Sequence, residues 1–346
     1  MWSIFNYIDF LLFLYFFICA IAIAIHVISS RNSHNTNLST DKVKEYRYAI
    51  VINALYFDFQ QDNCLDKLSK QDYNRSRFDL FVLKDSHVTF SIEAIIEKMN
   101  NSSKDYDNVI FLDIEDSIPL DLITKMNVAY NMSAMPIQAH KIDTSNTKKE
   151  TLHIAIKDEV YRQIYYNGRS SLGLASRIET NGILLNLKWL KNNRNLFQDQ
   201  SQTDLYLAAR GQYIVFLDKL YIDSKTNNMS ERRNKSEQLE DNDKKYMSQK
   251  IRFNYFKAIK SNQIDLTIDI AIPLLMSSLM PSLRILWISI TSIAIITMYI
   301  EFYLCLKWFI LILILTFFIM ITISDKLVTK HFDKAILKLL FNSHKK

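Results

Sequence analysis

The chain has 346 residues, of which 49% are hydrophobic and 23% charged, a balance typical of a folded protein and not of a disordered or fibrous one. It contains only four glycines and four prolines, which excludes collagen-like and Pro/Gly-rich architectures. Three cysteines are too few for a disulfide-stapled secreted domain, and none has a partner at the spacing of a zinc site. We therefore expect all three to be buried thiols.

Residues 1–30 are expected to anchor the chain in a membrane. The run 10–25 contains no polar side chain other than Tyr15. A helix of that length, rising about 1.5 Å per residue, crosses most of a hydrocarbon core of roughly 30 Å. A cleaved signal peptide is the alternative interpretation, but it requires a basic start, a shorter apolar run and a small-residue cleavage site, and the sequence has none of these.

Residues 284–324 are expected to form a transmembrane helical hairpin. Two apolar runs flank a short link, in which Glu301 and Lys307 should reach one membrane interface. The preceding residues 264–283 mix acidic and apolar side chains and contain two prolines. This mixture favours an amphipathic segment lying in the interface over a further span.

Basic residues beside these segments predict the orientation of the chain. None precedes the first span, whereas several follow it and more crowd the tail at 325–346. Because Lys and Arg collect on the cytoplasmic side, we expect a multi-pass protein of the inner (cytoplasmic) membrane whose middle region faces the cytoplasm. The net charge of +6 is then explained by topology and by contact with anionic membrane lipid, and no nucleic-acid partner is expected.

Residues 42–263 are expected to form one α/β domain. Short runs rich in strand formers alternate with segments of helical periodicity, which indicates a mostly parallel sheet covered on both faces. The expected strands are 48–55, 78–83, 108–112, 136–142 and 213–222, and the expected helices are 88–99, 120–130 and 151–166. The stretch 227–245 is polar and of mixed charge, so we expect a surface loop or a partly disordered insertion there.

Carboxylates follow two of the expected strands, at the edge where ligands of parallel sheets bind. Asp85 follows the second strand, and Asp113, Glu115 and Asp116 follow the third. Two carboxylates with one residue between them, on a turn that leaves a strand, can hold a hard divalent cation that bridges a diphosphate. Capping of a following helix explains the same residues, so the pattern alone leaves both interpretations open.

Three segments of the domain resemble motifs of membrane-bound family 2 glycosyltransferases of the bacterial type. Phe81-Val-Leu-Lys-Asp-Ser86 resembles the strand whose terminal Asp contacts the base of the donor. Phe111-Leu-Asp-Ile-Glu-Asp-Ser-Ile-Pro119 resembles the DxD turn with its following proline. Ile137-Gln-Ala-His-Lys141 resembles a Gln-x-His-Arg strand found in a bacterial subset of the family.

Two later segments extend the resemblance over nearly the whole chain. Asn167-Gly-Arg-Ser-Ser-Leu-Gly-Leu174, together with Asn181 and Gly182, resembles the glycine-marked stretch before the acceptor site of that subset. Gln249-Lys-Ile-Arg-Phe253 resembles the QxxRW motif that closes the catalytic domain ahead of the membrane hairpin. One anchor before the domain and a hairpin after it also match the family.

The resemblance implies a single Rossmann-like domain of the nucleotide-diphospho-sugar transferase (GT-A) type. It implies inverting transfer of a sugar from a nucleotide-diphospho-sugar to a hydroxyl of a lipid-linked or glycan acceptor. Asp85 would lie near the base of the donor, and Asp116 would belong to the same donor site. Asp113 and Glu115 would hold Mg²⁺ or Mn²⁺ on the diphosphate, and Arg252 would support the leaving group.

Further donor and acceptor contacts are implied by the same resemblance. Gln249 and Arg252 would bind the diphosphate or an anionic acceptor, and Phe253 would stack on a sugar while lacking the indole donor of the usual Trp. Arg252 is alternatively a cation that only reaches the interface. His140 either bonds a phosphate or the acceptor or is a satisfied structural residue of its strand, and Lys141 has the same two interpretations.

The sequence departs from the family where catalysis is concerned. Glu115 is one methylene longer than the usual second DxD carboxylate, and the acidic residue of the usual opening loop is missing. The position of the general base falls on Gln202, which cannot accept a proton, and Asp204 and Asp199 are the acidic alternatives. A non-catalytic relative that acts as a scaffold or partner in a glycan-assembly complex is therefore the alternative function.

All four glycines of the chain lie between residues 167 and 211. They are Gly168, Gly173, Gly182 and Gly211. A chain with so few glycines is expected to keep them where no side chain is tolerated, although ordinary turns and helix ends explain them as well. Asp218 and Asp223 lie towards the end of the last strand and are expected to be solvated.

Overall fold

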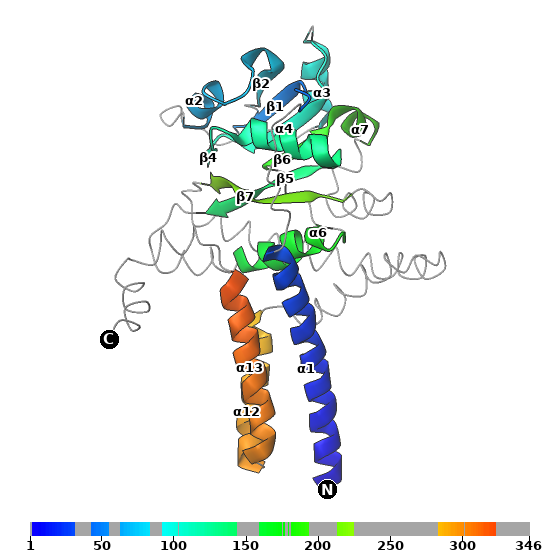
Figure 1. The fold of residues 1–346 in the computed structure, drawn as a ribbon, viewed down its shortest axis with the longest axis vertical. Helices are drawn as coiled ribbons and strands as arrows, with labels where there is room; N and C mark the ends of the chain where they lie inside the picture. Colours follow the sequence, from blue (N-terminus) through cyan, green and yellow to red (C-terminus); the bar gives the residue numbers. More distant parts are fainter. Residues whose placement is uncertain are drawn as a thin grey trace, which may run out of the picture.

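The computed structural model describes a mixed α/β domain with three apolar helices extending from one side of it (Figure 1). The described residues are 2–31, 43–54, 63–83, 92–102, 104–143, 159–174, 176, 179, 181–193, 213–224, 283–300 and 302–322. The expected polar loop 227–245, the basic tail 325–346 and all of the interfacial segment 264–283 but its last residue lie outside them. Those three expectations therefore stay predictions.

A sheet of seven described strands forms the centre of the domain, in the order β2-β1-β3-β6-β5-β7-β4. The strands are β1 (Tyr48–Asn53), β2 (Phe78–Leu83), β3 (Asn108–Asp113), β4 (Asp116–Ser117), β5 (Ile137–Asp143), β6 (Ile183–Asn186) and β7 (Val215–Ser224). β1 is parallel to β2 and β3, and β5 is parallel to β7. β6 runs antiparallel to both β3 and β5, and β4 runs antiparallel to β7. Because β6 is antiparallel to both β3 and β5, the strands β1, β2, β3, β5 and β7 all run in the same direction, as expected of a mostly parallel sheet, and only the short strands β6 and β4 are reversed among the seven described strands.

Helices cover both faces of this sheet. They are α2 (Asn63–Ser69), α3 (Ile92–Asn100), α4 (Leu122–Ser133) and α7 (Leu187–Asn192). Ile50 of β1 packs in one core with Leu68 of α2, whereas its neighbour Val51 packs in the other core with Ile95 of α3. Successive side chains of a strand point to opposite faces, so β1 has to be apolar throughout to serve both cores.

The three apolar helices are α1 (Trp2–Arg31), α12 (Leu283–Ile300) and α13 (Phe302–Thr322). Two of them, over Asn6–Arg31 and Cys305–Thr322, are long and apolar enough to cross a membrane by length and composition. The three helices pack together around the fully buried Trp308, whose ring meets that of Phe16 edge-on. The helices lie where the sequence predicts the anchor and the hairpin.

An ion pair joins α1 to α13 inside this bundle. Asp9 of α1 is 3% exposed and accepts hydrogen bonds from Lys307 and from the indole of Trp308, the latter at 2.9 Å. The sequence predicts that Lys307 reaches a membrane interface, and the structure directs it at Asp9. A buried charged side chain is costly unless it is paired, so this contact favours one alignment of the two helices.

We expect Asp9→Lys to destabilise the bundle, because two ammonium groups then face each other. The charge-swapped double variant Asp9→Lys/Lys307→Asp should recover most of the loss. The measurement is the thermal unfolding midpoint in detergent. Swapping the exposed pair Asp66 and Lys70 is the control and should change little. A double variant no better than Asp9→Lys would contradict the pairing.

One helix connects the sheet to the apolar bundle. It covers residues 159–171 and contains a π-helical stretch, Gln163–Gly168, followed by α6 (Arg169–Ser171). Its Val160 and Ile164 belong to the same apolar cluster as Trp308, so this helix packs against the three apolar helices. Figure 1 places this helix between the sheet and the three apolar helices.

Gly168 allows this helix to lie directly on α1. A Cβ atom at Gly168 would lie 2.5 Å from the carbonyl oxygen of His26. At Gly182, φ is +74° and a Cβ would lie 2.8 Å from Cδ1 of Ile222. The expectation that glycines occupy places without room for a side chain is therefore confirmed at these two positions, whereas Gly211 lies outside the described residues.

Gly168→Ala should weaken the docking of the 159–171 helix on α1, because the added methyl group meets backbone and not a side chain that can move. Gly173→Ala is the matched control, since its φ is +67° but nothing lies within 4 Å of the added Cβ. We expect Gly168→Ala to lower the unfolding midpoint in detergent clearly more than Gly173→Ala does. An unfolding midpoint of Gly168→Ala equal to that of wild type would contradict the close contact of the two backbones, whereas Gly173→Ala shows the cost of a strained φ without a clash.

Candidate functional site

A group of carboxylates lies where β3 ends, in the middle of the sheet. Asp113 is the last residue of β3, and its backbone N–H donates to Oδ2 of Asp116 at 3.2 Å, which closes the turn. Asp116 is buried, the side chain of Asp113 is 20% exposed, and Glu115 is exposed. Burial raises the pKa of Asp116 to about 6, against the opposing positive charge of Lys141. The turn therefore has one carboxylate inside and two towards the surface.

Lys141 brings a positive charge between these carboxylates. It comes from β5, and its Nζ lies 3.2 Å from Oδ2 of Asp113 and 3.3 Å from Oδ1 of Asp116. Burial alone would lower the pKa of Lys141, but the charges of Asp116 and Asp113 outweigh it and raise that pKa above its ordinary value. The ammonium therefore stays protonated at neutral pH.

The loop before β6 is attached to the same place. Asn181 Nδ2 donates to Oδ2 of Asp113. Gln138 of β5 donates from Nε2 to the carbonyl oxygen of Asn181 at 2.9 Å and accepts from the backbone N–H of Glu179 at 3.3 Å. The segment that resembles the stretch before the acceptor site is thus bonded both to β5 and to the carboxylate turn.

The side chains of this turn suit a hard divalent cation whose coordination is completed by a ligand. Asp113 and Glu115 offer carboxylate oxygens towards the surface, and Mg²⁺ commonly uses one or two carboxylates together with substrate phosphates. No group of three or more His, Cys, Asp or Glu side chains able to hold a metal occurs among the residues that the structure describes. Two carboxylates alone would leave most coordination positions of such an ion to a ligand or to water.

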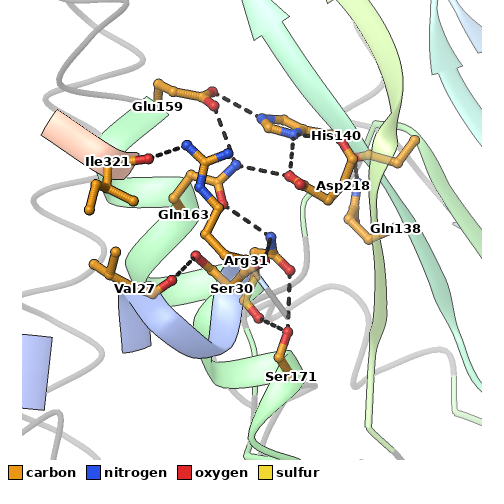
Figure 2. A network of polar contacts seen from close by, with 12 residues as sticks. Val27, Ser30, Arg31, Gln138, His140, Glu159, Gln163, Ser171, Asp218 and Ile321 are labelled. Carbon is orange, nitrogen blue, oxygen red and sulfur yellow. Dashed lines mark hydrogen bonds and ion pairs between the residues drawn. The ribbon is translucent and has the colours of Figure 1, made fainter. Parts of the chain in front are cut away.

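The fully buried His140, beside Lys141 on β5, belongs to a second polar cluster (Figure 2). Its Nε2 lies 2.9 Å from Oε2 of Glu159, and its Nδ1 lies 3.1 Å from Oδ1 of Asp218. Gln163 completes the cluster by donating to Oδ1 of Asp218 at 3.0 Å. A neutral imidazole has one N–H, whereas both ring nitrogens here face carboxylate oxygens, which is the arrangement of an imidazolium ion.

The charges of this cluster stabilise one another. Burial alone would lower the pKa of His140, but the charge of Glu159 and the hydrogen bonds to Asp218 and Glu159 outweigh it and raise that pKa to about 10. Burial alone would raise the pKa values of Glu159 and Asp218, whereas their contacts with His140 lower both below the ordinary range. The cluster is therefore ionised at neutral pH.

Asp218 is held by an irregularity in the pairing of β5 with β7. The register shifts between Ala139, which is opposite Leu217, and His140, which is opposite Tyr221. Such a bulge turns side chains away from the regular alternation, and here both the carbonyl and the carboxylate of Asp218 contact His140. Asp218, expected to be solvated, keeps a side chain that is 24% exposed, but its carboxylate is held by His140 and Gln163, and Asp223, near the end of β7, is also partly exposed.

The cluster continues to the ends of two apolar helices. Asn167 donates from Nδ2 to Oε1 of Gln163 at 3.0 Å and to the carbonyl oxygen of Ser30 at 3.1 Å. Arg31, the last residue of α1, donates to the carbonyl oxygen of Ile321 in α13. Figure 2 shows this path running from the sheet to the helix ends.

The structure brings together some of the predicted site residues and leaves others outside its description. Asp113, Glu115 and Asp116 share one turn, as predicted. Asp85, Asp199, Gln202, Asp204, Gln249, Arg252 and Phe253 lie outside the described residues, so their roles stay predictions. His140 has protein partners on both ring nitrogens, and any role of it towards a ligand also stays a prediction.

Sequence reasoning missed Glu159 and Gln163 and left Lys141 undecided. Glu159 and Gln163 lie one helical turn apart in an expected helix, a spacing that also fits an ordinary solvated face. The side chains of Lys141 and Asp113 meet only because β5 and β3 flank the short strand β6 in the sheet. A strand as short as β6, with four residues, carries little periodic signal.

Comparison with known proteins adds likenesses of structure alone. No family model matches the chain, and no curated protein matches it. The structure is similar to S. aureus TarS at 14% identity and a TM-score of 0.35, over 60% of this chain and 40% of that chain. This chain thus matches less than half the length of that TarS chain.

Two further solved structures are similar to this chain. TarS 1–349 in complex with UDP-GlcNAc has 11% identity and a TM-score of 0.34, over 60% of this chain and 67% of that chain. The mannosyltransferase PcManGT from Pyrobaculum calidifontis, in complex with GDP-Man and Mn²⁺, has 8% identity and a TM-score of 0.46, over 95% of this chain and 98% of that chain. These identities and TM-scores are too low to assign a family.

The raised pKa of His140 predicts a pH dependence of stability. A group whose pKa rises on folding contributes fully below its unfolded pKa, about 6.5 for His, and loses that contribution as pH rises through the folded value of about 10. We expect His140→Gln to be strongly destabilised at pH 6.5, since it leaves two carboxylates without a cation. Its deficit in unfolding midpoint relative to wild type should shrink towards pH 10.

The control for this comparison is Lys104→Gln, which removes the cation of an exposed pair with Asp79 and should show a small deficit. Glu159→Gln gives a second test, because it removes one of the two carboxylates that hold the imidazolium. A deficit of His140→Gln that stays constant from pH 6.5 to 10 would mean that His140 is not charged in the folded protein.

Proposed function

We propose that this chain is a membrane-anchored glycosyltransferase. It transfers a sugar from a nucleotide-diphospho-sugar to a hydroxyl of a lipid-linked or glycan acceptor, with inversion at the anomeric carbon. The observation that carries the proposal is the turn at the end of β3. There Asp113 and Glu115 lie towards the surface, Asp116 is buried beneath them, and Lys141 and Asn181 bond to Asp113.

The turn is suited to the diphosphate of the donor. Mg²⁺ or Mn²⁺ would be held by Asp113 and Glu115, and when bound it would neutralise charge on the leaving diphosphate. Asp85 would lie near the base of the donor. Arg252 of the Gln249–Phe253 segment would add a second cation on the leaving group, since a guanidinium matches phosphate oxygens well.

The transfer itself is a displacement in which one bond forms as another breaks. The acceptor oxygen bonds to the anomeric carbon while the bond from that carbon to the diphosphate oxygen breaks, and the nucleoside diphosphate leaves. The hydroxyl proton goes to a base on the side opposite the diphosphate. Asp204 or Asp199 would be this base, and Gln202 would only hold the acceptor by hydrogen bonds.

Contacts of the 159–171 helix support an acceptor at the membrane. This helix bonds to the sheet through Glu159 and lies on α1 through Gly168, so the domain is attached closely to the apolar helices. We propose that the domain faces the cytoplasm at the inner membrane and that the acceptor hydroxyl approaches from the membrane side. Membrane lipid would then be a direct partner.

The test is nucleotide binding by the detergent-purified full chain. UDP and GDP are titrated with and without Mg²⁺ or Mn²⁺, beside Asp113→Asn and the exposed control Asp121→Asn. We expect saturable, metal-dependent binding of one nucleotide, weakened at least about tenfold by Asp113→Asn, which costs one charged metal ligand, and unchanged by Asp121→Asn. Absence of binding at millimolar nucleotide by a folded protein would favour the scaffold alternative.

A further inference from the structure

Lys141 occupies a position that affects how a cation enters the carboxylate turn. Its Nζ lies within 3.3 Å of both Asp113 and Asp116, and its side chain is only 9% exposed. The contacts of β5 on either side hold it there, because Gln138 bonds to the loop before β6 and His140 bonds to Glu159. The ammonium is thus a built-in cation of the turn, positioned by the sheet and not by its own flexible stem.

This ammonium competes with a divalent ion for Asp113. Oδ2 of Asp113 already accepts from Lys141 at 3.2 Å and from Asn181. A divalent ion bound to the same carboxylate would lie close to the positive charge of Lys141, and like charges at a few ångströms in a partly buried site repel strongly. Metal binding to the empty turn is therefore opposed by Lys141.

A bound diphosphate would offset the repulsion between Lys141 and the divalent ion. A lysine ammonium has three donors; Nζ of Lys141 donates one to Oδ2 of Asp113 and lies 3.3 Å from Oδ1 of Asp116 without a hydrogen bond to it, so donors remain for a phosphate oxygen. The negative charge of a diphosphate offsets both cations at once. The repulsion that opposes the metal alone is absent when the metal arrives with a nucleoside diphosphate.

We propose that Lys141 makes the binding of the divalent metal and of the nucleoside diphosphate mutually dependent, so that the turn takes up either one well only in the presence of the other. This inference rests on the proposed function, because it assumes that the turn binds a diphosphate with a metal. Lys141 is then a positioning residue of the donor site, and its effect is a coupling between two ligands, which thermodynamics requires to be reciprocal.

The first test needs no variant. The Kd of Mn²⁺ for the wild-type full chain is measured by quantifying free Mn²⁺ from its electron paramagnetic resonance signal. The titration is done without nucleotide and with saturating UDP or GDP, whichever of the two binds. We expect Mn²⁺ to bind at least about tenfold more tightly with the nucleotide, within the usual range of coupling between sites. Equal affinities would overturn the inference.

The second test uses Lys141→Met, which keeps the length of the side chain and removes its charge. We expect Mn²⁺ alone to bind this variant about tenfold more tightly than it binds wild type, and Mn²⁺ with saturating nucleotide to bind about as tightly as it binds wild type, so that the coupling shrinks by about that factor. Lys141→Arg keeps the charge and should keep weak binding of Mn²⁺ alone. Lys104→Met, at the exposed pair with Asp79, is the matched control and should behave as wild type.

The outcomes separate this inference from the proposed function. A wild-type chain that binds neither UDP nor GDP with metal contradicts both. Nucleotide binding with metal, together with an unchanged affinity of Lys141→Met for Mn²⁺ alone, contradicts the role of Lys141 and leaves the proposed function standing. If Lys141→Met does not fold, the shorter neutral variant Lys141→Gln takes its place, and an unchanged affinity of Lys141→Gln for Mn²⁺ alone likewise contradicts the role of Lys141.

Discussion

The structure of the domain depends on carboxylates that pair with two neighbouring buried cations on one interior strand. His140 and Lys141 of β5 are both buried, and each is held by two carboxylates from other elements. Breaking a buried ion pair on one side typically costs about 3–5 kcal/mol, so neither cation can leave its partners cheaply. β5 thereby fixes the turn after β3 through Lys141 and the 159–171 helix through His140.

The same constraint connects the candidate site to the apolar helices. The 159–171 helix bonds to β5 through Glu159, lies against α1 at Gly168 and contributes Ile164 to the cluster around Trp308. The contacts of α1 with the carboxylate turn therefore run through the 159–171 helix and β5. For the proposed acceptor at the membrane, this arrangement would hold the carboxylate turn at a fixed distance from the apolar helices.

Charge also explains why the turn differs from a preformed metal site. Asp113 is shared between Asn181 and Lys141, and Asp116 is buried beneath, so protein groups already satisfy much of the negative charge of the turn. Under the proposed role of Lys141, the turn would bind an ion well only when a ligand brings further negative charge. Lys141 would then serve both the stability of the domain and the proposed coupling between its two ligands.

The sequence by itself determined the local features: five of the strands, the apolar helices and the placement of Asp113, Glu115 and Asp116 after a strand. Hydrophobic periodicity, length and the polarity of strand ends are local properties, and they can be read from neighbouring residues. The likeness to a glycosyltransferase also came from short segments in order. Only the tertiary structure decided the reversed pairing of β6, the bulge that turns Asp218 to His140, and the contacts of Lys141 with Asp113 and of Asp9 with Lys307. These join residues 28 to 298 positions apart, and spacing along the chain carries no information about which distant charges will meet.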